Sequence, residues 1–187
     1  QKSPSIVFID ELDSVLSARS SSDSETSRRL KTEFLVQLDG LTPVAGGNRS
    51  GQVVVIGATN RPFDLDDAVM RRLPVRIHLP LPDHKARIEL LKSLISQHSQ
   101  SLTDRQIEEI GRKTERFSAC DITNLCREAS MAAVRELSAT QVAQMHAAQV
   151  RAITYQDFAQ ALQRIQPSVS AATVAELRRW EESVRSR

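Results

Sequence analysis

Long apolar runs and aromatic residues are scarce in this sequence of 187 residues, which has one Trp and one Tyr. No apolar stretch approaches the roughly 20 residues that a membrane-spanning helix needs, and residues 1–15 lack the charged-then-apolar layout of a signal peptide. The composition, 40% hydrophobic and 26% charged, is typical of a helix-rich globular protein rather than a disordered one. We therefore expect an intracellular protein, cytoplasmic, nuclear or both, without a membrane segment.

Metal-binding patterns and strong charge are also missing. The two cysteines, Cys120 and Cys126, form neither a CxxC pair nor part of a zinc pattern, and the four histidines include no HExxH motif. Cys126 shares a helical stripe with apolar neighbours, which predicts a buried thiol. The net charge of only +2 argues against a general nucleic-acid-binding surface, although arginines cluster locally.

Two short apolar runs end in polar residues that suit phosphate chemistry. Residues 5–9 read Ser-Ile-Val-Phe-Ile and are followed directly by Asp10 and Glu11. Residues 53–56 read Val-Val-Val-Ile and are followed, after three residues, by Asn60. Short uninterrupted apolar runs are typical of parallel strands covered on both faces. We predict two such strands, with Asp10 and Asn60 at equivalent positions on one edge of the sheet.

A helix is predicted between these strands. Leu30, Phe34 and Leu38 recur at helical spacing and form one apolar stripe, so we place the helix over residues 24–39. Gly40 is expected to end it, because glycine is the usual residue just after a helix.

The remainder of the chain is predicted to be mostly helical. A third short strand is expected at residues 74–79, before two prolines. Three later helices share a start signal of a Ser or Thr cap with a flanking hydrophobic pair. These pairs are Leu102 with Ile107, Ile153 with Phe158, and Val169 with Val174. Thr103 with Gln106 adds a capping box at the first of these helices. We therefore predict an α/β part over residues 1–82, a small helical domain over 83–166 and a C-terminal helix within 167–187.

The polar residues after the strands suggest nucleotide hydrolysis. Asp10 would help to hold Mg²⁺ and Glu11 the attacking water, while Asn60 could orient the same water or touch the γ-phosphate. Arg71 and Arg72 could stabilise the charge of phosphoryl transfer across a subunit boundary. Each feature also has a structural alternative: acidic residues favour a helix N-terminus, Asn-Arg-Pro is a turn sequence, and paired arginines are often a solvated turn.

Three motifs, in order and at the right spacing, resemble those of the AAA ATPases. They are residues 6–13 for Walker B, 57–62 for sensor 1 and 65–72 for the arginine fingers. Residues 27–34, and 167–170 leading to Trp180, point to the meiotic clade, which holds katanin, spastin, fidgetin and the endosomal-sorting ATPase. Within it, residues 34–40, 71–73 and 125–130 look most like fidgetin-like proteins, and the resemblance covers essentially the whole chain.

The resemblance implies a fold and an activity. The fold would be α/β, with a partial P-loop NTPase parallel sheet followed by a helical lid and a C-terminal helix. The intact protein would be a homo-hexameric ring that hydrolyses ATP with Mg²⁺ and remodels or severs protein assemblies, with microtubules the expected substrate. A second pore loop would fall in residues 18–29, where Arg19, Arg28 and Arg29 could attract acidic tubulin tails, although such residues are often merely solvated.

Two departures from the family pattern limit these expectations. The sequence contains no Gly-Lys dipeptide, so it lacks the Walker A phosphate loop and should not hydrolyse ATP alone. By resemblance, a missing strand would lie in the sheet between the strands at residues 53–56 and 75–79, so the sheet would have a gap in its middle and unpaired edges. In the lid, Arg116 and Ala119 replace two family glycines beside Cys120, near where the resemblance places the adenine. If the backbone there needs a positive φ, Ala119 would cost on the order of 1 kcal/mol.

Three functions compete at this point. The first is an ATP-driven remodeller, for which a Walker A motif upstream of Gln1 is expected. The second is a non-catalytic module that binds ring partners. The third, a nucleic-acid-associated AAA protein, is weaker because the sequence has no recognition element and no strong basic face.

Overall fold

The computed structural model describes residues 4–17, 24–41, 53–144, 146 and 149–185. The chain divides into two compact units, one of residues 1–78 with 176–187 and one of residues 79–175. We call them the sheet unit and the helical unit. None of the helices in the described ranges is both long and apolar enough to span a membrane.

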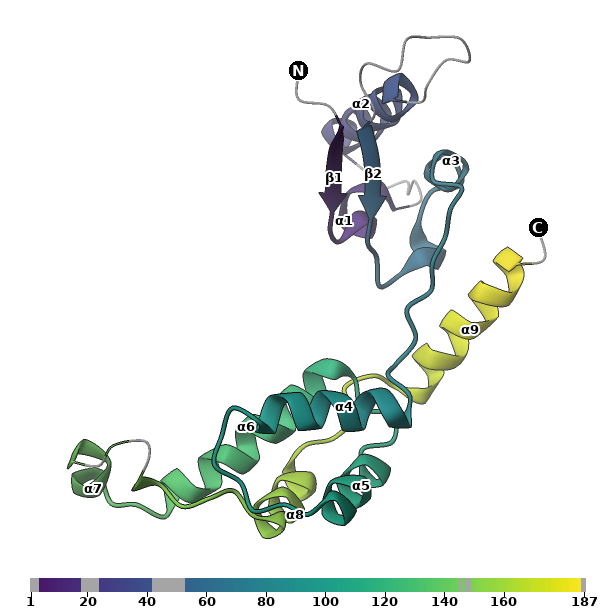
Figure 1. Cartoon of the computed structure of the whole chain (residues 1–187). Coiled ribbons are helices and arrows are strands. Elements are labelled where there is room, and N and C mark those ends of the chain that lie inside the picture. The colour runs from purple at the N-terminus through teal and green to yellow at the C-terminus, as the bar shows by residue number, and fades with distance from the viewer. Residues whose placement is uncertain (1–3, 18–23, 42–52, 145, 147–148, 186–187) are drawn as a thin grey trace. The chain divides into compact units, whose positions relative to one another are not determined.

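The sheet unit contains both predicted strands. β1 (Ser5–Ile9) and β2 (Val53–Gly57) pair in parallel, with Ser5 opposite Val53 and Ile9 opposite Gly57 (Figure 1). Both strands are rich in β-branched residues, which pack well on a pleated surface. Because the pairing is parallel and in step, the residues that follow the two strands leave the sheet at the same edge.

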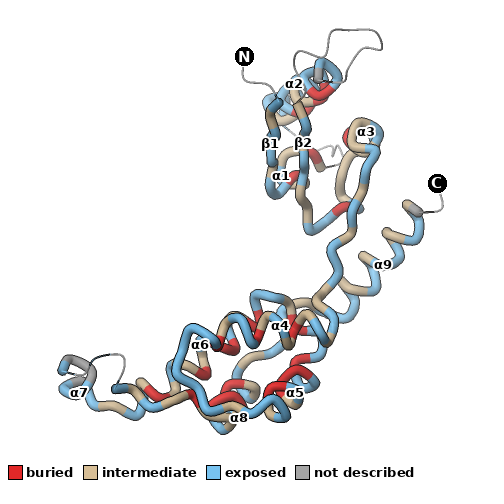
Figure 2. Tube along the Cα trace, viewed as in Figure 1, coloured by how far each residue is buried: buried red, intermediate tan, exposed pale blue. Residues whose placement is uncertain are grey.

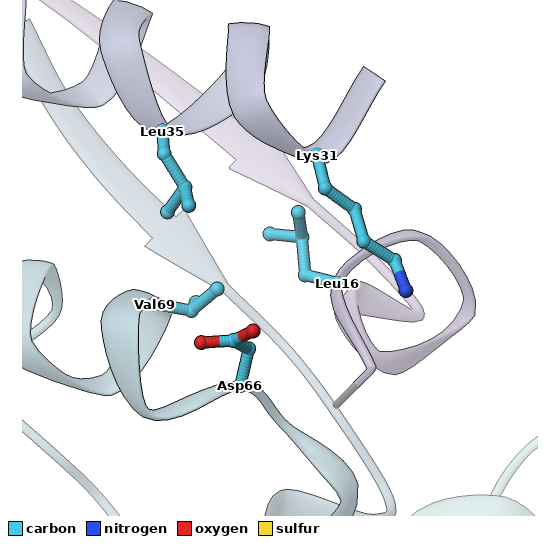
Figure 3. A pocket seen from close by; sticks show the side chains of 5 residues that line it. All are labelled: Leu16, Lys31, Leu35, Asp66 and Val69. Atoms are coloured by element: carbon cyan, nitrogen blue, oxygen red, sulfur yellow. The ribbon is translucent and has the colours of Figure 1, made fainter. Parts of the chain in front are cut away.

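Helices of different lengths accompany this sheet and supply a small core. They are α1 (Leu12–Leu16), α2 (Glu25–Leu41), the 3₁₀ turn η1 (Pro62–Asp64) and α3 (Asp67–Arg72). The buried apolar cluster consists of Leu12, Leu16, Leu35 and Val69. Lys31 and Leu35 extend from α2 toward Leu16 and α3 (Figure 3), and Lys31 is buried along with them. The four-carbon stem of a lysine can line an apolar interior in this way.

The predicted stripe on α2 is confirmed in part: Leu38 is buried and Phe34 packs against the sheet unit's core, but Leu30 does not. Leu30 is exposed, and the buried residues of this helix are Lys31, Leu35 and Leu38. Lys31 was not predicted to be buried, because a charged residue usually faces solvent, whereas here its aliphatic stem is buried. Gly40 does not end the helix either, since α2 continues to Leu41.

The predicted third strand does not form. Residues 74–79 have no regular secondary structure, and Val75, Ile77 and Leu79 are 81%, 79% and 86% exposed. A strand needs neighbouring backbone groups to complete its hydrogen bonds, and the described residues supply none beside this segment. Residues 74–79 therefore have the alternating apolar and polar residues of a strand, but they are not paired with any described strand.

One face of the β1–β2 pair is open as well. Ile6 and Phe8 of β1 lie opposite Val54 and Ile56 of β2, and all four are exposed. The paired register places them on one side of the pleat, where they form a continuous apolar patch.

The C-terminal helix α9 (Ala171–Arg185) begins after Ser170, whose hydroxyl accepts a hydrogen bond from the backbone N–H of Thr173. From residue 176 onward α9 belongs to the sheet unit. There Glu181 Oε2 lies 2.7 Å from Nδ1 of His78, and both side chains are largely shielded from solvent.

The helical unit has a single large core. It comprises α4 (His84–Ile95), α5 (Asp104–Lys113), α6 (Ala119–Arg135), α7 (Ala139–Gln144) and α8 (Tyr155–Arg164). Its most deeply buried side chains come from α4, α5, α6 and α8 (Figure 2): Leu91, Ile110, Ile122, Leu125, Ala129 and Phe158.

Two predictions for this unit are confirmed. Thr103 and Gln106 form the expected capping box at the start of α5. Cys126 lies in the core, and burial raises the pKa of its thiol to about 12.

Arginine–carboxylate pairs link the helical unit's elements around this core. Arg151 binds Asp157 at 2.7 Å and Glu136 at 2.6 Å. Glu128 on α6 binds both Arg135 and Arg164, so it connects α6 to the end of α8. These charge-assisted contacts fix helices that the apolar core already holds together.

Candidate active site

The candidate site lies where β1 and β2 end. The backbone N–H of Ala58 donates to the carbonyl of Ile9 at 2.8 Å, and the N–H of Leu12 donates to the carbonyl of Ala58 at 2.9 Å. These two bonds extend the parallel pairing past the last strand residues. They hold the loop that carries Asn60 beside the turn that carries Asp10 and Glu11.

Asp10 and Glu11 are both exposed at this edge. Asp10 Oδ1 accepts a hydrogen bond from the backbone N–H of Glu11 at 2.8 Å. Glu11 precedes α1 with a left-handed backbone, at φ 50° and ψ 46°. A non-glycine residue in this region is strained by about 1–2 kcal/mol, and such strain is concentrated at functional sites.

Asp10 is suited to bind magnesium as a single carboxylate ligand. Among the described residues, no three acidic, histidine or cysteine side chains are grouped so that they could enclose a metal ion. Magnesium is commonly held by one or two carboxylates, with phosphate and water oxygens completing its shell. An exposed aspartate at a strand's carboxyl end fits that mode of binding.

Gly57 leaves room for the side chain of Leu12 at the end of β2. A Cβ atom built on Gly57 would lie 2.8 Å from Cδ2 of Leu12, which is closer than real side chains approach. Leu12 is buried in the sheet unit's core and begins α1. The glycine therefore lets α1 approach the strand end directly behind Glu11.

Thr59 links the two loops through its side chain. Its hydroxyl donates to Oδ1 of Asp13 at 2.5 Å and accepts from the backbone N–H of Arg61 at 3.0 Å. Asn60 lies between these bonds and is exposed. Neither Thr59 nor Asp13 was singled out in the sequence. The only signal was their position inside the same two motifs as Asn60 and Glu11.

The two candidate finger arginines lie at the end of α3 and differ in environment. Asp66 caps the start of this short helix by accepting from the N–H of Ala68. Arg72 donates two hydrogen bonds to the carboxylate of Asp39 on α2, at 2.7 and 2.6 Å. This paired arrangement lowers the pKa of Asp39. Arg71 is exposed at the same helix end, so it is the more accessible of the two guanidinium groups.

The three candidate pore arginines do not share one environment. Arg19 lies outside the described residues. Arg28 and Arg29 lie in the first turns of α2 rather than in a loop, and both are exposed. Arg29 pairs with Glu25 at 2.6 Å on the helix surface.

The lid candidates Ala119 and Cys120 lie in the helical unit, at the exposed start of α6. The positive φ suspected at Ala119 is found instead at Arg116, where φ is 66°. Ala119 is the first residue of a helix capped by Ser118, and a helical backbone accepts alanine readily. The strained substitution is therefore the arginine, which ends the turn after α5.

Asp121 holds this start of α6 together. Its carboxylate accepts from the backbone N–H of Ser118 at 2.8 Å, and from the N–H and hydroxyl of Ser168 at 3.2 and 3.0 Å. Burial alone would raise the pKa of Asp121, but the hydrogen bonds from Ser118 and Ser168 outweigh it and lower the pKa. No pattern in the sequence marks this contact, which joins residues 47 positions apart.

Two family models match the chain. The model described as "ATPase family associated with various cellular activities (AAA)" matches residues 1–81, and that of the AAA+ lid domain matches residues 104–149. Together the two ranges take in more than half of the chain.

Individual proteins and structures agree with these models. Spastin from Naegleria gruberi is 46% identical to this chain, over 96% of this chain and 34% of its own length. Human fidgetin-like protein 1 is 42% identical, over 96% of this chain and 26% of its own length. The chain thus spans about a third or less of these relatives.

The crystal structure of the FIGL-1 AAA domain with ADP has a TM-score of 0.85 at 36% identity, covering 98% of this chain and 59% of that one. A katanin structure, described as a basis for self-assembly, has a TM-score of 0.73 at 34% identity, covering 95% of this chain and 58% of that one. The fold is a partial AAA fold of a two-stranded parallel sheet with helices and a lid. The chain belongs to the AAA ATPases, in the group that contains spastin, katanin and the fidgetin-like proteins.

Proposed function

We propose that the intact protein hydrolyses ATP and that this chain supplies the water-activating edge of its active site. One observation carries the proposal: two neighbouring parallel strands bring Asp10 and Glu11 to the same edge as Asn60, and backbone hydrogen bonds beyond the strands hold the loops together. Ligands of open parallel sheets bind at the carboxyl ends of the strands.

Each of these residues has a distinct role in the proposal. Asp10 holds the magnesium ion, which when bound would neutralise phosphate charge. Glu11 accepts the proton of the attacking water, and Asn60 orients that water or contacts the γ-phosphate. All three side chains are exposed at the strand edge and therefore accessible to a nucleotide.

Arg71 and Arg72 are the proposed fingers toward a neighbouring subunit of a homo-hexamer. An arginine supplied across a subunit boundary stabilises the charge of phosphoryl transfer. The exposed Arg71 can reach outward directly, whereas Arg72 must first leave Asp39. The similarity to a katanin structure described as a basis for self-assembly supports assembly of the intact protein.

The three segments predicted from the sequence have corresponding proposed roles. Residues 1–82 belong to the large α/β subdomain, 83–166 to the lid and 167–187 to a C-terminal helix. Ala119 and Cys120 would lie near the adenine. The match of the lid family model to residues 104–149 supports this placement of Ala119 and Cys120.

The proposed substrate of the intact protein is a protein assembly, with microtubules the first candidate. Spastin, katanin and fidgetin-like proteins are the relatives that favour it. Arg19, Arg28 and Arg29 would attract acidic polypeptide tails such as those of tubulin. The chain alone is expected to be inactive, because it has no Gly-Lys dipeptide and so no Walker A loop.

The decisive test is Glu11→Gln in the intact protein. Loss of the general base should lower ATP turnover at least about a hundredfold, while ATP binding persists because the amide keeps the shape of the side chain. Glu115→Gln, an equally conservative change at an exposed site of the helical unit, is the matched control and should leave turnover unchanged.

Unchanged hydrolysis in Glu11→Gln would remove the assigned role of this residue. Binding of ring partners without any turnover in the wild-type protein would favour the alternative, a non-catalytic interaction module.

A further inference from the structure

The backbone contacts between the two site loops stop before they reach Asn60. The last of them is the hydrogen bond between the Leu12 N–H and the Ala58 carbonyl. Asn60 lies two residues farther along and is exposed, so these contacts do not fix its position. A side chain that must orient a water needs its backbone held to within a fraction of an ångström.

The Thr59 hydroxyl makes the next contact. A hydroxyl has one proton to donate and can also accept, and Thr59 uses both capacities. It donates to Asp13 and accepts from the N–H of Arg61, so it constrains the chain on both sides of Asn60. Thr59 and Asp13 are each only partly exposed, and a hydrogen bond to a carboxylate is stronger than one between neutral groups.

Asp13 is itself a fixed point. It lies in α1 between Leu12 and Leu16, which are 2% and 1% exposed and belong to the sheet unit's core. It also follows Glu11 by only two residues, across the left-handed turn. The core therefore holds Asp13, Asp13 holds Thr59, and Thr59 holds Asn60 relative to Glu11.

We infer that Thr59 and Asp13 are positioning residues for the hydrolysis of ATP, setting where Asn60 lies opposite Glu11. The inference rests on the proposed function. A merely structural role would lower stability without changing the turnover of the folded enzyme. A positioning role lowers kcat and leaves the KM for ATP nearly unchanged, because neither residue is assigned a contact with the nucleotide.

The test compares three threonine variants of the intact protein. Thr59→Val keeps the shape and removes the hydroxyl, so kcat should fall on the order of tenfold to a hundredfold with KM changed less than about threefold. Thr59→Ser restores the hydroxyl and should recover most of kcat. Thr32→Val is the matched control, because among the described residues the exposed Thr32 hydroxyl bonds within α2, to the carbonyl of Arg28.

A double substitution locates the effect in the pair. Thr59→Val combined with Asp13→Ala should be no slower than Asp13→Ala alone, because each removes the same contact. Amide hydrogen exchange should also be faster at Arg61 in Thr59→Val than in the Thr32→Val control.

The possible results distinguish the inference from the proposed function on which it rests. A folded Thr59→Val enzyme with wild-type kcat, or a Thr59→Ser enzyme as slow as Thr59→Val, would overturn the inference and leave the proposed function standing. A wild-type protein that hydrolyses ATP no faster than Glu11→Gln would overturn both.

Discussion

The two units of this chain bury apolar residues to very different extents. The helical unit surrounds one core built from α4, α5, α6 and α8, in which Ile110, Leu125 and Phe158 are fully buried. Among the described residues, the cluster of the sheet unit holds four buried apolar side chains, and Ile6 and Phe8 are exposed to solvent. The helical unit therefore has a core of its own to stabilise it, whereas no described residue covers the exposed face of the sheet.

Two phenylalanines provide the largest test of that contrast. Phe158→Ala should destabilise the helical unit by about 3–5 kcal/mol, because it empties a fully buried site. Phe8→Ala, in a strand residue that is 63% exposed, should cost this chain less than about 1 kcal/mol. Urea unfolding of the two variants, followed by circular dichroism, measures both effects. Equal losses would mean that the sheet face is covered in solution.

Acid should affect the helical unit through its ion pairs. The hydrogen bond from Arg151 lowers the pKa of Asp157 from 3.8 to about 2, and that from Arg135 lowers the pKa of Glu128 from 4.5 to about 2. A carboxylate with a lowered folded-state pKa contributes stability that is present above its unfolded pKa. This contribution is lost as the pH falls from about 4.5 toward 2.

The check is the urea midpoint as a function of pH. In Asp157→Asn the slope between pH 4 and 2 should be shallower than in the wild type, although the variant starts from a lower stability. An unchanged slope would show that Asp157 does not carry a lowered pKa in the folded protein.

The smallest expected effect concerns backbone strain, which occurs once in each unit among the described non-glycine residues. Arg116→Gly and Glu11→Gly should each stabilise the chain by about 0.5–1 kcal/mol, since glycine adopts a positive φ without strain but gains entropy when unfolded. Only Glu11→Gly should abolish turnover of the intact protein. Thermal unfolding and ATPase rates measure the two properties.

Ala119→Gly is the control for this prediction and should destabilise α6 slightly, because Ala119 is helical. A gain in stability there would restore the original expectation that the strain lies at Ala119.

Local patterns in the sequence predicted the local structure well. The apolar runs before Asp10 and Asn60 form strands over nearly the predicted residues, and the capping box of Thr103 marks the start of α5. These features depend on neighbours within a few residues, so their causes are visible in the sequence itself.

Contacts between distant residues were not predictable in this way. Arg72 meets Asp39 across 33 positions, and Thr59 meets Asp13 across 46. Nothing in a single sequence marks which carboxylate an arginine or a hydroxyl will find after folding. The prediction of a strand at residues 74–79 was wrong for the converse reason. The pattern there favours a strand, but a strand also requires a neighbouring strand to pair with.

The exposure of residues 74–79 would affect the abundance of the protein in a cell. Val75, Ile77 and Leu79 present alternating apolar side chains, and among the described residues no strand pairs with this backbone. Chaperones bind such extended apolar stretches, and uncovered strand edges promote aggregation. A newly made copy would therefore remain subject to quality control until this stretch is covered. Its abundance would depend on how quickly that happens as well as on its folding free energy.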